Sequence, residues 1–124
     1  MKKMYDMTGK VVLITGGSRG LGRAMALGFA AQGANIAIVS RKIESCKETA
    51  KEIEALGVKA FPYTAHAASW DDMGEMAEAV YEHFGTIDVL VNNAGMSPLY
   101  PSLEEISEEL FDKVIGVNLK GPFR

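Results

Sequence analysis

The stretch VVLITGGSRGLGRA, residues 11–24, joins a short apolar run directly to a segment rich in glycine. The run contains β-branched residues and ends at a glycine, so it predicts a buried strand over residues 10–16. A helical period follows and predicts a helix from about Gly20 to Gln32, which Gly33 ends. The glycines between strand and helix permit unusual φ values and a close approach to the backbone. Because a helix N-terminus offers unpaired N–H groups and a positive dipole end, this segment predicts a site for a bulky anion.

The alternation of apolar run and helical period continues along the chain. Further strands are expected over residues 35–40 and 58–65, and residues 86–95 form a fourth strand with its exit turn. Further helices are expected over residues 43–56 and 69–84, and after the loop 96–102. Ser69 and Asp72 have the spacing of a capping box, and either Ser102 or Ser107 caps the last helix. Pro62 favours an edge position for the third strand because proline cannot donate to a neighbouring strand.

This order of elements, β-α-β-α-β-α-β-α, predicts an α/β fold. Strands joined by crossover helices run parallel, and right-handed crossovers place helices on both faces of the sheet. We therefore expect a single domain over residues 1–124 with a doubly wound, Rossmann-like parallel sheet. Ligands of such sheets bind at the carboxyl ends of the strands.

Composition and charge argue against several kinds of partner. A net charge of −3, with both signs interspersed, gives no basic surface for nucleic acid. No apolar stretch approaches the roughly 20 residues that span a bilayer, and no long apolar segment follows Lys2 and Lys3, as a secretory signal requires. The single cysteine, Cys46, has no ligand cluster around it and is expected to be a buried, inert thiol. We expect a cytoplasmic protein without a metal site and without a nucleic-acid or membrane partner.

The glycine spacing separates this loop from two familiar phosphate-binding loops. Its pattern, Gly16-x-x-x-Gly20-x-Gly22, differs from G-x-G-x-x-G. Arg23 and Ala24 stand where a Walker A loop requires Lys and then Ser or Thr. The identity of the ligand therefore depends on the residues around the loop.

The residues after the second expected strand favour NADP(H) over NAD(H). Sites for NAD place an acidic residue there to bind the ribose 2′-hydroxyl, but this chain has Ser40-Arg41-Lys42. A guanidinium at that point suits a 2′-phosphate, and Arg19 adds a second cation on the same side. The alternative is that Arg19 and Arg41 are ordinary surface residues.

Two later motifs agree with a dinucleotide. In NNAG, residues 92–95, asparagines can tie adjacent strand ends together, while Ala94 and Gly95 leave room for a flat cofactor ring. In VNLKG, residues 117–121, the carbonyl of Asn118 has no donor at Pro122, which lacks an N–H. If the helix continues past Pro122, that carbonyl is free to hold a water. The alternative is that the helix ends there.

With TGGSRGLG, NNAG and VN at 117–118 in this order, the chain resembles the short-chain dehydrogenase/reductase family from Lys10 to Phe123. The resemblance implies the N-terminal part of an NADP(H)-dependent oxidoreductase. The complete enzyme would transfer hydride between nicotinamide and a small-molecule carbonyl or secondary alcohol, such as a 3-oxoacyl thioester. Asn118 would match the family's catalytic asparagine, whose main-chain carbonyl holds a water in a proton relay. His66 stands where the family usually has an acidic residue that contacts adenine. The implied cofactor-binding residues are Gly16, Ser18, Arg19, Gly20, Leu21, Gly22, Ser40, Arg41, His66, Asn92, Ala94 and Gly95.

Catalysis in this family also needs a serine and a Tyr-x-x-x-Lys pair. The four residues that follow Tyr5, Tyr63, Tyr81 and Tyr100 by four positions are Gly9, Ala67, Gly85 and Glu104, so no tyrosine has its lysine. A tyrosine donates the proton only when a nearby cation lowers its pKa. We therefore expect this chain alone to be inactive. Two alternatives are a nucleotide-binding or interaction module without catalysis, and a sensor of redox state.

The resemblance also implies the strand order 3-2-1-4, with a further strand beyond the fourth. Without that strand, the segment IDVLV, residues 87–91, is an exposed apolar edge. Such an edge can pair with another chain. We therefore expect self-association or a homo-oligomer.

Overall fold

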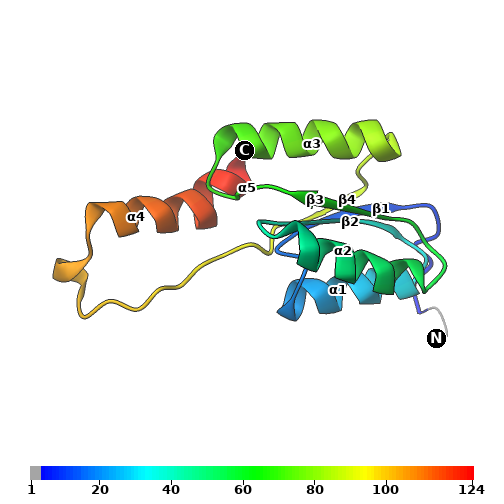
Figure 1. Ribbon diagram of the computed structural model, residues 1–124, viewed down its shortest axis with the longest axis horizontal. Coiled ribbons are helices and arrows are strands. Elements are labelled where there is room, and N and C mark those ends of the chain that lie inside the picture. The colour runs from blue at the N-terminus through cyan, green and yellow to red at the C-terminus, as the bar shows by residue number, and fades with distance from the viewer. Residues whose placement is uncertain (1–3) are drawn as a thin grey trace.

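The protein folds around a four-stranded sheet with helices on both faces (Figure 1). The computed structural model describes residues 4–124, so Lys2 and Lys3 lie outside the described residues. The elements are β1 (Val11–Thr15), α1 (Gly20–Ala31), β2 (Asn35–Ser40), α2 (Ile43–Glu54), β3 (Ala60–Thr64), α3 (Trp70–Phe84), β4 (Val89–Val91), the 3₁₀ turn η1 (Leu103–Glu105), α4 (Glu108–Ile115), the π-helical turn η2 (Gly116–Lys120) and α5 (Gly121–Phe123). All strand pairs are parallel, in the order β3-β2-β1-β4. The predicted doubly wound α/β fold is confirmed.

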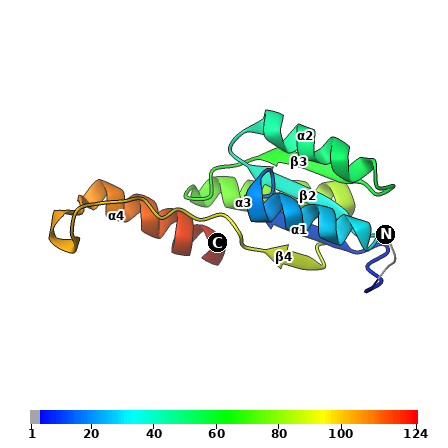
Figure 2. The ribbon, with the colours of Figure 1, turned by 90° about the horizontal axis from the view of Figure 1, so that it is seen from below.

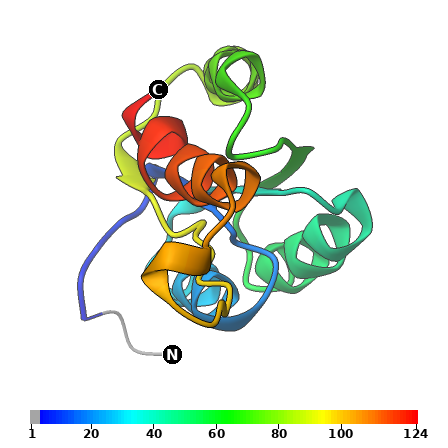
Figure 3. The same cartoon turned by 90° about the vertical axis from the view of Figure 1, so that its left-hand side faces the viewer.

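Alternate residues of the central strands supply two separate cores. Val12, Ile14, Ile36 and Ile38 pack on one face of the sheet with Ala26, Ala30, Cys46, Ala50 and Ile53 of α1 and α2. Leu13, Ala37 and Val39 pack on the other face with Met73, Met76 and Val80 of α3. Figure 3 shows α3 on one side of the sheet and α1 and α2 on the other. Because both faces are covered, β1 and β2 read as nearly continuous apolar runs in the sequence.

The two outer strands are β3 and β4. Pro62 lies in β3, so its predicted edge position is confirmed. β4 forms the opposite edge, and its Leu90 is 52% exposed. The strand covers only Val89–Val91, shorter than expected, because the chain leaves the sheet at Asn92 as an extended segment.

The capping predictions are partly wrong. Ser69 caps α3, since its hydroxyl accepts from the Asp72 N–H at 3.2 Å. The reciprocal bond of a capping box is missing, because the Ser69 N–H donates to the carbonyl of His66 at 2.9 Å. The Asp72 carboxylate accepts from the backbone N–H of His66 instead, at 2.9 Å. Of the two candidates for the last helix, Ser107 is the cap, and it accepts from the Leu110 N–H at 3.1 Å.

The last helix does not end at Gly121-Pro122. It continues from α4 through η2 into α5, so the alternative of an early end is wrong. The N–H of Gly121 donates to the carbonyl of Gly116, five residues earlier, which defines the π turn. Figure 2 shows this helical segment and the extended segment 92–102 projecting past one end of the sheet. Among the described residues, no helix is long and apolar enough to cross a membrane.

Candidate functional site

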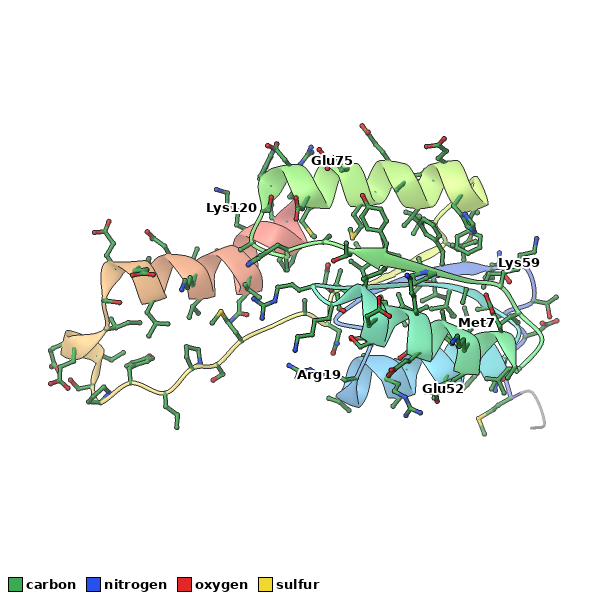
Figure 4. All side chains as sticks on the ribbon, viewed as in Figure 1. Met7, Arg19, Glu52, Lys59, Glu75 and Lys120 are labelled. Carbon is green, nitrogen blue, oxygen red and sulfur yellow. The ribbon has the colours of Figure 1, made fainter. Side chains whose placement is uncertain are left out.

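The candidate site lies at the carboxyl ends of the strands, where the exit loops of β1, β2 and β4 meet. The β1 exit is the glycine loop, residues 16–19, and the N–H groups of Gly16 and Gly17 hold it to the carbonyl of Val39 at 2.7 and 3.3 Å. Figure 4 shows Arg19 at this end of the sheet and Lys59 at the other. The extended segment that follows β4 leaves the sheet from the same end (Figure 1).

The glycine loop depends on residues without side chains. Gly16 has a φ of 65°, in the left-handed region that favours glycine. A Cβ on Gly22, in the first turn of α1, would overlap the carbonyl oxygen of Gly16. The turn from β1 into α1 therefore packs backbone on backbone. Unpaired N–H groups at a helix N-terminus suit an anionic ligand, so the anion site at this turn stays a prediction.

A threonine and an asparagine tie the β1 exit to the β4 exit. The Thr15 hydroxyl accepts from the N–H groups of Asn93 and Ala94, each at 3.1 Å. The Asn93 side-chain amide donates to the carbonyl of Gly16 at 3.0 Å. Asparagine therefore does join the strand ends, as expected of NNAG. Thr15 and Asn93 were not predicted as site residues from the sequence. Each is a polar residue at the exit of a strand, and this pattern becomes specific only once β1 is known to pair with β4.

Hydroxyl groups and cations gather where β2 ends. The Ser18 hydroxyl of the glycine loop donates to the Ser40 hydroxyl at 3.1 Å. Arg19 and Arg41 are exposed, and in the part of the chain that the structure describes neither has a carboxylate within ion-pair distance. Arg23 differs, because it pairs with Glu52 of α2. Two exposed arginines without a carboxylate partner among residues 4–124 therefore follow the two hydrogen-bonded serines directly along the chain.

His66 lies in the loop after β3 and uses one ring nitrogen within the loop. Its Nδ1 accepts from the backbone N–H of Ala68 at 3.0 Å. A neutral ring that accepts at Nδ1 carries its hydrogen on Nε2, so Nε2 is the donor that a ligand could meet. His66 does not line the cavity beside Asn118, described next.

Asn118 connects the last helix to the β4 exit. Its side-chain amide donates to the carbonyl of Met96 at 2.8 Å and accepts from the N–H of Met96 at 2.9 Å. No sequence motif indicated this pair of hydrogen bonds to Met96. An open cavity of about 540 Å³ lies here, and its walls are Asn92, Ala94, Gly95, Met96, Ser97, Asn118 and Pro122. The structure therefore brings Asn118 together with three of the predicted cofactor residues. No group of acidic, cysteine or histidine side chains suited to a metal ion occurs among residues 4–124.

The chain matches a known family over nearly its whole length. The family model described as short chain dehydrogenase matches residues 10–124. An uncharacterized oxidoreductase of Thermotoga maritima is 45% identical over 118 residues, which cover 95% of this chain and 46% of that protein. The chain therefore spans about half the length of this relative.

Solved structures show the same fold. A metagenomic short-chain oxidoreductase in complex with NADP is 33% identical, with a TM-score of 0.91, and the match covers 94% of this chain and 53% of that one. The 3-ketoacyl-(acyl-carrier-protein) reductase of Brucella melitensis, complexed with NADH, is 36% identical, with a TM-score of 0.87. That match covers 95% of this chain and 47% of the reductase.

Proposed function

The chain belongs to the short chain dehydrogenase family, and on that premise we propose that it is the NADP(H)-binding part of a cytoplasmic oxidoreductase. The complete enzyme would reduce a carbonyl or oxidise a secondary alcohol. The similarity to the Brucella melitensis reductase supports 3-oxoacyl thioesters as one substrate class. The observation that carries the choice of NADP(H) is a pair of exposed arginines after β1 and β2, Arg19 and Arg41, neither of which has a carboxylate partner among residues 4–124.

The adenosine end of the site fits a dinucleotide that carries a 2′-phosphate. The glycine loop and the first turn of α1 present backbone N–H groups to a diphosphate. Beside them, the hydroxyls of Ser18 and Ser40 and the guanidinium groups of Arg19 and Arg41 can donate to a further phosphate. Residues 40–42 contain no carboxylate that could bind a 2′-hydroxyl. His66 would offer Nε2–H toward adenine.

The other end of the site fits the reacting ring. Asn92, Ala94 and Gly95 would line the nicotinamide in the cavity beside Asn118. When bound, NADPH supplies the hydride. The carbonyl of Asn118, with no N–H at Pro122, would hold a water that passes a proton toward the substrate. The Asn118 side chain keeps that segment in place through Met96.

A second candidate is a dinucleotide-binding module without catalysis. It is favoured by the tyrosines of this chain, none of which has a lysine four residues later. Adding NADPH and a 3-oxoacyl thioester to the chain tests the second candidate, because loss of NADPH absorbance would report reduction and exclude a module without catalysis. Binding without reduction fits the module, or a chain that needs further residues for proton transfer.

Titration with NADPH and NADH tests the cofactor proposal. We expect the chain to bind NADPH more tightly. Arg41→Ala should weaken NADPH binding about tenfold and leave NADH binding nearly unchanged, because a charge-assisted hydrogen bond contributes about 1.5–3 kcal/mol. Lys59→Ala is the matched control, since Lys59 is an exposed cation at the other end of the sheet (Figure 4). Tighter binding of NADH by the unaltered chain would overturn the preference.

A further inference from the structure

The buried face of α2 carries two polar side chains behind the end of β2. Thr49 is 2% exposed and Cys46 is fully buried, whereas the other buried residues of this helix, Ala50 and Ile53, are apolar. Burial of a polar group is costly unless it is hydrogen-bonded. The partners of these two side chains therefore show what the helix holds in place.

Both partners belong to the predicted cofactor site. The Thr49 hydroxyl donates to the main-chain carbonyl of Ser18 at 3.1 Å. The Cys46 sulfur lies 3.0 Å from the Ser40 hydroxyl. Because the Ser18 hydroxyl also donates to the Ser40 hydroxyl, α2 contacts both serines of this pair, one at its main chain and one at its side chain.

The thiol gives Ser40 a partner in either orientation of its hydrogen. Cys46 can donate to the carbonyl of Tyr63, 3.7 Å away, and then accept from Ser40. It can also donate to Ser40, which frees the Ser40 hydrogen for a phosphate oxygen. The N–H of Lys42 supports the same state, since it donates to the Ser40 oxygen at 3.3 Å. The Ser40 hydroxyl can thus donate to a phosphate oxygen while its own oxygen still accepts from the Cys46 thiol and the Lys42 N–H.

We propose that Thr49 and Cys46 are positioning residues that hold Ser18 and Ser40 in the geometry required by the 2′-phosphate of NADP(H). This inference rests on the proposed cofactor preference. It assigns the preference to a second layer of residues, which touch no cofactor atom themselves. The backbone N–H groups at the start of α1 are held by the helix, so the diphosphate contacts that NADH shares depend less on α2.

Paired variants at Thr49 test the proposal. Thr49→Val keeps the shape of the side chain but removes the hydroxyl, and Thr49→Ser keeps the hydroxyl. We expect Thr49→Val to raise the Kd for NADPH about fivefold and the Kd for NADH less than twofold, on the scale of one ordinary hydrogen bond. Thr49→Ser should keep the affinity ratio of the unaltered chain. If Thr49 had only a structural role, Thr49→Val would weaken the binding of both cofactors equally and leave the ratio of the two Kd values unchanged.

The thiol is tested in the same way. Cys46→Ser retains a donor and an acceptor beside Ser40, whereas Cys46→Ala retains neither. We expect only Cys46→Ala to lower the NADPH-to-NADH preference, by about two- to fivefold. If the unaltered chain prefers NADPH but Thr49→Val and Cys46→Ala keep its ratio, this inference fails and the proposed function stands. If the unaltered chain shows no preference for NADPH, both fail.

Discussion

Asn118 serves two parts of the site through different atoms. Its side-chain amide exchanges two hydrogen bonds with the backbone of Met96, at 2.8 and 2.9 Å, and so fixes the segment that leaves β4. In an α-helix, the main-chain carbonyl of Asn118 would accept from the N–H four residues later. That residue is Pro122, which has no N–H. A substitution at 118 therefore moves the wall of the cavity as well as any water that the carbonyl holds. Loss of activity in such a variant would not by itself identify the carbonyl as the catalytic group.

Gly22 allows a prediction with a control in the same helix. The added methyl of Gly22→Ala would overlap the carbonyl of Gly16 and force the loop apart, so we expect a loss of about 1–3 kcal/mol in the free energy of unfolding. Binding of NADPH and NADH should weaken together, because the diphosphate cradle itself changes. Urea unfolding and the two titrations measure these effects.

Gly28 provides the control because a Cβ there meets no atom within 4 Å. It lies in the interior of α1, where alanine is favoured over glycine by about 0.5–1 kcal/mol. Gly28→Ala should therefore stabilise the chain and leave cofactor binding unchanged. Equal stabilities of the two alanine variants would contradict the close packing at Gly22.

Two serines at helix starts allow a test of how much a side-chain cap stabilises a helix. Ser69→Ala removes the acceptor for the Asp72 N–H and should lower the free energy of unfolding by about 1 kcal/mol. Ser102 is the control, since its hydroxyl bonds the Glu105 side chain and caps no backbone N–H. Ser102→Ala should change stability by less than about 0.5 kcal/mol. Thermal unfolding compares the two, and a larger loss at Ser102 would show that η1 depends on it.

The sequence predicted those features that depend on neighbouring residues. The Ser69 cap and the helix that follows it are set within a few residues, and the edge position of Pro62 follows from its missing N–H. The Thr15 bonds to Asn93 and Ala94 could not be predicted, because they join residues nearly eighty positions apart through the pairing of β1 with β4. The hydrogen bond from the His66 N–H to the Asp72 carboxylate depends on how the loop turns at His66. Pro122 left open whether the last helix ends or continues, and the structure shows that it continues through a π turn.

Much apolar surface lies outside the two cores. The extended segment and α4 project beyond the sheet, and α4 has no buried residue (Figures 1 and 2). Exposed apolar side chains in this part are Leu99, Tyr100, Leu103, Phe111, Ile115, Leu119 and Phe123. The chain spans about half the length of the Thermotoga maritima oxidoreductase and of the metagenomic oxidoreductase. Removing this apolar surface from water would be favourable by about 25 cal/mol of free energy per Å².

The β4 edge leads to a prediction about association. Its backbone pairs with β1 on one side only, and Leu90 is 52% exposed, so two chains can join at this edge. We expect the mass measured by light scattering to rise above the 13.4 kDa of one chain as the concentration increases. Leu90→Lys should weaken this association about tenfold, because burial of a leucine contributes about 1.5 kcal/mol or more and a lysine blocks edge pairing.

Leu56→Lys is the matched control for Leu90→Lys. Leu56 is 49% exposed, nearly as much as Leu90, but it follows α2 and lies away from the β4 edge. Its substitution should leave the association constant unchanged, since it adds the same charge without touching the edge. Equal effects of the two lysines would mean that net charge governs the association. A heat-stable monomer at every concentration would contradict the role of the exposed edge altogether.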